Sequence, residues 1–279
     1  MSARSLAARA YRRCAAPFGL RTLERMLADG LPEQLAAPLR YLFDGDEPPR
    51  THRIADDIER VRTELASRSG TFTLASTSAS HPPVLTWAWL ANNVSVQRRW
   101  GVFLHLCAEA FGARNVLELG SCVGISGAYL AAVSHRPRVV SIEASPELAP
   151  VAAATIARFT TNGTVLRGMF DDRLPDAIEG PVGLAYIDGH HDGAATIRYV
   201  QAIVPHLERG ALIVLDDIRL YAEMIEAWGS LRAMPGVGVA VDVGRFGLLV
   251  WGEGEGRLYD LARYTGWWRV GGRRPGRPR

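Results

Sequence analysis

The sequence predicts a doubly wound α/β fold: a mostly parallel, seven-stranded sheet with a terminal antiparallel hairpin, preceded by an N-terminal helical extension. Three observations predict it. From residue 115 onward, short apolar runs alternate with helical segments, as in parallel sheets covered on both faces. A turn bracketed by Gly120 and Gly124 follows the first of these runs. Near the end, the runs 237–243 and 246–251 are so close that they must pair antiparallel, because a parallel pair needs a long crossover.

The elements follow from apolar periodicity along the chain. Residues 22–43 and the region around 54–65 repeat apolar side chains at helical spacing, and a helix is expected at 96–111. We divide the chain into an N-terminal helical extension or cap (1–90), a main domain (91–270) and a disordered basic tail (271–279), which contains only Gly, Arg and Pro. Parallel strands are expected at 115–119, 138–143, 164–168, 182–188 and 211–216, with helices at 125–133, 146–160, 193–207 and 221–232.

Composition excludes several classes of protein. The chain has 279 residues, 48% of them hydrophobic, and a net charge of +3, which is too mild to predict nucleic-acid binding. No run approaches the ~20 apolar residues of a membrane span, so no membrane association is expected. Three widely spaced cysteines show no metal-ligand spacing and predict a reducing, cytoplasmic location. All basic residues are arginine, which favours a bacterial genome rich in GC and leaves no lysine as a base.

The glycine turn after the first strand differs from a dinucleotide fingerprint. A G-x-G-x-x-G pattern starting at Gly120 would need glycine where Cys122 and Ile125 stand, so a dehydrogenase is disfavoured. Glu118 lies where a carboxylate attracts a cationic ligand, directly or through water. Glu143 ends the next apolar run, where an acidic side chain accepts hydrogen bonds from ribose hydroxyls. The alternative is a purely structural βα turn.

Carboxylates end two further strands. Asp188 follows the fourth strand, and Asp216 and Asp217 follow the fifth. Because ligands collect at the carboxyl ends of parallel strands, these three side chains are expected to converge. Three carboxylates without a counterion repel one another, and a hard divalent cation with oxygen ligands resolves that repulsion. Taken alone, an Asp-Asp pair after a strand is often a helix cap plus a solvated acid, and Asp188-Gly189 could be a turn.

Together, Glu118-x-Gly120-x-x-x-Gly124 and Glu143 resemble the motifs of class I S-adenosylmethionine (SAM)-dependent methyltransferases, which have a Rossmann-like fold. The three aspartates resemble the metal ligands of the divalent-metal-dependent O-methyltransferases, including the catechol type and related sugar enzymes. The resemblance covers roughly residues 92–251. It implies SAM and Mg²⁺ as cofactors, with Asp188, Asp216 and Asp217 as metal ligands. The residues implied to bind the cofactor are Glu118, Gly120, Ser121, Gly124, Ser126, Glu143, Asp171 and Asp188.

The resemblance also predicts a general base, with one departure. The catechol type has a lysine three residues after the first metal ligand, whereas here that residue is His191, as in some sugar O-methyltransferases. His190 and Asp192 are the nearest alternatives. Asp171 matches the region that touches adenine in the family, but it reads equally well as a helix N-cap.

The predicted function is Mg²⁺-assisted transfer of a methyl group from SAM to a hydroxyl of a small phenolic, sugar or natural-product acceptor. The metal would lower the hydroxyl pKa and His191 would take its proton. Trp87, Trp89, Trp100 and Tyr221 could line the acceptor pocket, although at least one tryptophan is expected in the core. The alternatives are a metal-independent methyltransferase of the same fold and an RNA-interacting SAM-fold protein. A homodimer through the N-terminal helices is also possible.

Overall fold

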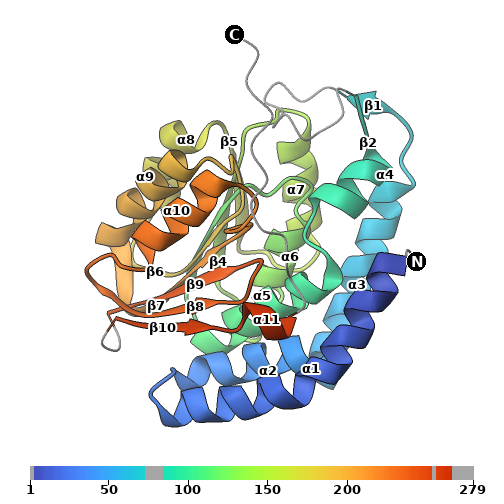
Figure 1. Ribbon diagram of the computed structural model, residues 1–279. Helices are drawn as coiled ribbons and strands as arrows, with labels where there is room; N and C mark the ends of the chain where they lie inside the picture. The colour runs from blue at the N-terminus through green and yellow to red at the C-terminus, as the bar shows by residue number, and fades with distance from the viewer. Residues whose placement is uncertain (1–2, 73–83, 253–255, 266–279) are drawn as a thin grey trace.

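The computed structural model describes residues 3–72, 84–252 and 256–265. The predicted tail, 271–279, lies outside the described residues. The chain folds around one large sheet with helices on both faces, and the N-terminal helices lie along one side of this assembly (Figure 1). The predicted doubly wound, mostly parallel α/β fold with an N-terminal helical region is therefore confirmed.

The large sheet has eight strands rather than the predicted seven, in the order β10-β8-β9-β7-β6-β3-β4-β5. Strand β9 runs antiparallel to β7 and β8, which gives the predicted hairpin, and the other neighbours pair parallel. The extra strand is β10, which pairs parallel with β8 at one edge. The strands are β3 (Asn115–Leu119), β4 (Arg138–Glu143), β5 (Gly163–Arg167), β6 (Val182–Ile187), β7 (Leu207–Leu215), β8 (Val237–Asp242), β9 (Gly247–Trp251) and β10 (Arg257–Asp260).

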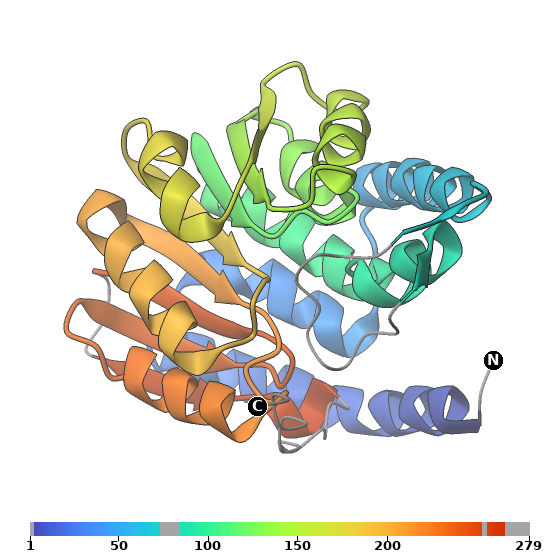
Figure 2. The same cartoon turned by 90° about the horizontal axis from the view of Figure 1, so that it is seen from above.

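Side chains alternate along the strands between two hydrophobic layers, as the period of a strand requires. Val116, Leu184 and Val214 belong to one layer, whereas their neighbours Leu117 and Ala185 belong to the other. Helices α5 and α6 cover the first face, and α8, α9 and α10 cover the second (Figure 2). The helices of this part are α5 (Arg98–Phe111), α6 (Ile125–Ala131), α7 (Leu148–Ala157), α8 (Phe170–Ala177), α9 (Gly193–Ile203) and α10 (Ala222–Leu231). Of these, α8 was not predicted.

The N-terminal helices share the first hydrophobic layer. Leu23, Leu39 and Ile58 are fully buried and belong to the same cluster as Phe103 of α5. These helices are α1 (Ala3–Ala28), α2 (Ala36–Asp44) and α3 (Pro49–Ala66), followed by a small β1–β2 pair (Thr71–Phe72 and Leu85–Thr86) and by α4 (Trp87–Trp89). The domain boundaries near residues 90 and 270 stay predictions. No helix in the described ranges has both the length and the apolarity to cross a bilayer.

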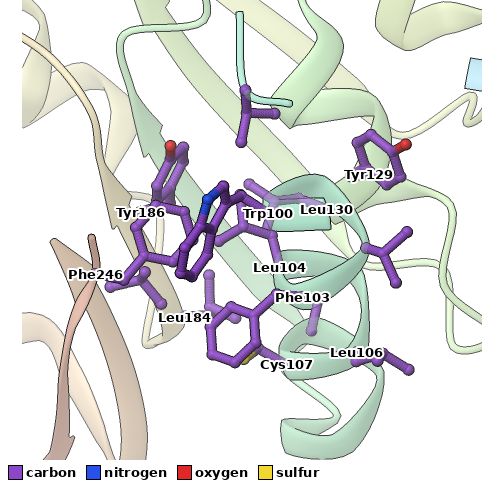
Figure 3. Close-up of a cluster of buried hydrophobic side chains, with 14 of the residues drawn as sticks. Trp100, Phe103, Leu104, Leu106, Cys107, Tyr129, Leu130, Leu184, Tyr186 and Phe246 are labelled. Atoms are coloured by element: carbon purple, nitrogen blue, oxygen red, sulfur yellow. The ribbon is translucent and has the colours of Figure 1, made fainter. Parts of the chain in front are cut away.

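An aromatic cluster fills the layer beneath the hairpin. The ring centroid of Phe246 lies 4.8 Å from that of Trp100, 5.8 Å from Phe103 and 5.9 Å from Tyr186. Figure 3 shows these rings gathered between the strands and α5. Trp100 is therefore a core residue, as expected for at least one tryptophan. The same cluster packs against the ring of Tyr186 at the sheet.

The turn after β3 needs glycine for steric reasons. Gly120 has φ +93°, and a Cβ there would lie 1.9 Å from the carbonyl oxygen of Asp188. We expect Gly120→Ala to lower the free energy of unfolding by about 2–5 kcal/mol, since left-handed strain and overpacking add. Gly112 is the matched control: its φ is +60°, but a Cβ there meets nothing within 4 Å. Gly112→Ala should cost only about 1–2 kcal/mol. Chemical denaturation measures both, and equal losses would contradict the close approach.

Glu118 is an acidic residue inside the fold. Its Oε2 accepts a hydrogen bond of 2.5 Å from the Ser141 hydroxyl, and it contacts Ser126 of α6. Burial raises its pKa from 4.5 to about 7, against the effect of the two serines. Because the folded-state pKa is the higher one, the unfolded chain loses this proton first as pH rises. The free energy of unfolding should therefore fall between pH 4.5 and pH 7 and level off above.

We expect Glu118→Gln to remove this fall. Relative to wild type, the variant should gain about 3 kcal/mol between these two pH values, at about 1.4 kcal/mol per pKa unit. Denaturant titrations across the pH range measure the difference. Glu147→Gln removes an exposed glutamate and controls for the change in net charge. Parallel pH curves for wild type and Glu118→Gln would show that Glu118 is ionised in the folded state.

Candidate active site

The glycine turn and the end of β4 are joined by hydrogen bonds. Glu143 accepts one from the Cys122 amide at 2.8 Å and one from the Ser145 amide at 2.9 Å. The Ala144 amide is a third backbone donor to this carboxylate. A carboxylate has about four acceptor positions, so one of them stays available to a ligand hydroxyl. Burial raises the pKa of Glu143, and its backbone donors oppose that shift. Glu143 therefore lies beside the glycine turn, where a ribose is predicted.

The turn itself carries polar groups suited to a bound cofactor. Ser121 and Ser126 are buried, and the Ser121 hydroxyl has no hydrogen-bond partner among the described residues. An unsatisfied buried hydroxyl is costly unless a ligand or water pairs with it. Gly124 has φ +85° and lies tightly against the backbone of Ala152 on α7. These features fit a polar cofactor held at the start of α6. Glu118, by contrast, is enclosed beneath the turn and contacts the serines described above.

Asp188 and Asp216 meet at the carboxyl ends of β6 and β7, as expected. The Tyr186 hydroxyl lies 2.9 Å from Asp188 Oδ2 and 2.8 Å from Asp216 Oδ2. One hydroxyl carries a single proton, so it donates fully to only one of the two carboxyls at a time. Tyr186 therefore couples the two aspartates. This residue was not singled out from sequence, because an aromatic in a strand reads as core.

The counterion of this cluster is an arginine that the sequence did not point to. Arg245 binds Asp216 through two bonds of 2.7 Å, Nε to Oδ1 and Nη2 to Oδ2. The Asp216 side chain is 0% exposed and that of Arg245 is 12% exposed. Asp217 lies at the edge of the pair, with Oδ1 4.0 Å from Arg245 Nε. Among the described residues, no group of three or more His, Cys, Asp or Glu side chains could hold a metal ion. Asp216 and Asp217 thus lie at a guanidinium, and Asp188 is joined to Asp216 through Tyr186.

The two aspartates respond differently to this environment. Burial raises the pKa of Asp188 well above its usual range, and the charge of Asp216 adds to the shift. Burial opposes ionisation of Asp216 as well, but Arg245 outweighs it and holds the pKa of Asp216 below its usual range. Asp216 is therefore the charged member of the pair, and Asp188 is the member that more readily holds a proton.

The structure separates the three candidate bases. His191 Nε2 lies 3.7 Å from Asp188 Oδ1, so this ring belongs to the carboxylate cluster. His190 contacts a different group: its Nδ1 lies 3.1 Å from the Tyr199 hydroxyl on α9. Asp192 caps α9 by accepting a hydrogen bond from the Ala195 amide at 2.9 Å. Of the three, His191 alone contacts an aspartate of the cluster in these hydrogen bonds and ion pairs.

Asp171 lies apart from the other candidates. It is in the first turn of α8, its side chain is 61% exposed, and its Oδ2 lies 3.6 Å from Arg198 on α9. The N-cap of α8 is Met169, which makes no side-chain cap bond, so the alternative interpretation of Asp171 as the cap is wrong. Contact of Asp171 with adenine stays a prediction. The start of α8 does approach the site, because the Phe170 ring packs against Gly189.

Comparisons with known proteins agree on one family. A family model described as a methyltransferase domain matches residues 117–218. The chain is 34% identical over 154 residues to the catechol O-methyltransferase of Mycobacterium tuberculosis, covering 52% of this chain and 69% of that protein. The crystal structure of cofactor-bound Rv0187 from MTB has a TM-score of 0.54 and 25% identity, covering 80% of this chain and 99% of the other.

A second solved structure shows the same fold. The O-methyltransferase from Bacillus cereus in complex with SAH has a TM-score of 0.51 at 20% identity, covering 71% of this chain and 90% of the other. The matched region contains the glycine turn, Glu143 and the strand-end aspartates. This chain belongs to the class I SAM-dependent O-methyltransferases.

Proposed function

We propose that this enzyme methylates a hydroxyl of a small phenolic, sugar or natural-product acceptor, with His191 as the general base. The observation that carries the proposal is the contact of His191 with Asp188 at the sheet edge that also holds the glycine turn. When bound, SAM supplies a methyl group on a sulfonium. The similarity to a catechol O-methyltransferase supports a phenolic acceptor as the first choice.

In this proposal, different residues of the chain bind the cofactor and take the proton. The glycine turn, Ser121 and Glu143 would bind the cofactor through backbone amides, a hydroxyl and a carboxylate. Asp188 would orient His191, and His191 would take the acceptor proton as the new O–C bond forms and the methyl–sulfur bond breaks, leaving its electron pair on sulfur. Histidine is the side chain that most often acts as a general base in enzymes. Ligation of Mg²⁺ by Asp188, Asp216 and Asp217 stays a prediction; their present partners do not fit a metal centre, and no step is assigned to one.

The setting of the enzyme is also part of the proposal. We infer a cytoplasmic location, supported by three free cysteines. We expect neither nucleic acid nor membrane as a partner. A homodimer through the N-terminal helices is supported by the exposed Phe18 on α1.

The cofactor is tested by calorimetric titration of SAM into the protein. We expect saturable binding with one site per chain, because the turn offers a buried hydroxyl and a carboxylate at the place where the family binds it. Assays with catechol as probe acceptor then measure transfer. Absence of SAM binding in buffers with Mg²⁺ and with EDTA would refute the proposed function.

The base is tested with a matched pair of variants. Both histidines have positive φ, 67° for His190 and 40° for His191, and asparagine tolerates that conformation. We expect His191→Asn to lower kcat by roughly 10²–10⁴-fold, the usual contribution of a general base, while SAM affinity is kept. His190→Asn should leave kcat within a few-fold of wild type, since this ring contacts Tyr199. If both variants lose activity equally, His191 is not the base.

A further inference from the structure

Four hydrogen-bonding groups already surround the Asp216 carboxylate. Its Oδ1 accepts from Arg245 Nε at 2.7 Å and from the Asp217 amide at 2.6 Å. Its Oδ2 accepts from Arg245 Nη2 at 2.7 Å and from the Tyr186 hydroxyl at 2.8 Å. A carboxylate offers about four lone-pair positions. Arg245 and the Asp217 amide fill three of them, and the Tyr186 hydroxyl, whose one proton is shared with Asp188, occupies the fourth. A metal ion could take Asp216 as a ligand only by displacing one of these donors.

The sheet register brings Arg245 to this place. In the β7–β9 pair, Gly247 lies opposite Leu215, the last residue of β7 and the one directly before Asp216. Arg245 is two residues before Gly247, in the turn from β8, so it projects from the strand beside the acids. The turn is fixed on both sides, because Ile218 donates a backbone bond to the Arg245 carbonyl and Phe246 is fully buried. The guanidinium is thus part of the folded framework.

The arginine also supplies the charge that the cluster needs. A guanidinium stays protonated in proteins, so Arg245 brings a permanent positive charge to three carboxyls that would otherwise repel one another. Its planar fork matches Asp216 with two parallel bonds, which gives strength and fixed geometry. Through Tyr186, a fixed Asp216 also fixes Asp188, and Asp188 faces His191.

We propose that Arg245 stands where a divalent cation would otherwise neutralise these carboxylates, and that this enzyme transfers methyl groups without a metal. Arg245 is then a positioning residue: it holds Asp216, Tyr186 and Asp188 in the arrangement that orients His191. The statement about transfer rests on the proposed function, whereas the statement about metal binding does not.

The test removes the guanidinium and looks for a gained metal site. Mn²⁺ prefers oxygen ligands and is followed by electron paramagnetic resonance or calorimetry. We expect wild type to show no saturable binding up to about 1 mM Mn²⁺, the weak end for carboxylate sites. Arg245→Gln should bind one Mn²⁺ per chain, because three acids and His191 then lack their cation. Adding Asp216→Asn to that variant should abolish the gained binding.

Two control variants separate this effect from the general loss of an arginine. Arg219 forms a similar pair with Asp242, at 2.6 Å between Nη2 and Oδ2, and its second acidic neighbour in the ion pairs is Asp260. Arg219→Gln should gain no Mn²⁺ site, and Arg245→Lys, which keeps a charge, should also gain none. Gain of an equal site by Arg219→Gln would overturn the assignment. Circular dichroism checks that each variant is folded.

Measurements on wild type decide the proposal even if Arg245→Gln does not fold. Transfer should continue in EDTA at the rate seen with Mg²⁺. Saturable Mn²⁺ binding by wild type that Asp188→Asn removes would overturn the proposal, as would transfer lost in EDTA and restored by Mg²⁺. If SAM fails to bind, the proposed function fails instead, while the Mn²⁺ titrations still report on Arg245.

Discussion

The buried pair of Asp216 and Arg245 is the interaction on which the strand edge depends. Transferring two charges out of water is expensive, and the cost is recovered only when the geometry is good and the remaining polar positions are satisfied. Both conditions hold, because Asp216 accepts from a backbone amide and a tyrosine as well as from the arginine. Removing either partner would leave an uncompensated buried charge. The pair therefore fixes the positions of the tyrosine and the backbone amide that bond to Asp216.

The site is built from parts that the sheet brings together from distant segments. The glycine turn follows β3, Glu143 ends β4, and the aspartates follow β6 and β7. The order of these strands places β6 between β3 and β7. The glycine turn after β3 is therefore next to Asp188 after β6, which in turn is next to Asp216 after β7. The carbonyl of Asp188 lies so close to Gly120 that the two halves are in direct backbone contact. The glycine turn and the Asp188–His191 contact thus lie at the same corner of the fold.

The sequence predicted the parts of this arrangement that depend on local pattern. Apolar runs identified the five parallel strands and the hairpin, because buried strands of a parallel sheet read as continuous hydrophobic segments. Strand β10 was missed because its four residues alternate in burial and follow a glycine-rich stretch. Helix α8 was missed because it is short and contains Pro175.

Local sequence patterns could not predict which positive charge balances the acids of the site. The convergence of three acids was predicted from the rule that strand ends meet, and the need for a cation followed from electrostatics. The identity of that cation depends on the register of β9 against β7, which no local pattern specifies. An arginine in the short connection of an otherwise apolar hairpin was the signal that was available. Because β9 pairs antiparallel with β7, an arginine just before β9 lies beside the end of β7.

The last described elements tie the end of the chain to its beginning. Strand β10 and helix α11 (Ala262–Thr265) reach the N-terminal helices: the Tyr259 hydroxyl donates to the Asp29 carbonyl at 3.1 Å, and the Tyr11 hydroxyl to the Arg263 carbonyl at 2.8 Å. These contacts join segments far apart in the chain, so they can form only after residues 257–264 have been synthesised. Helix α1 also packs on α2, which follows it directly in the chain, so it can dock in two steps, first on α2 and then on the C-terminal segment.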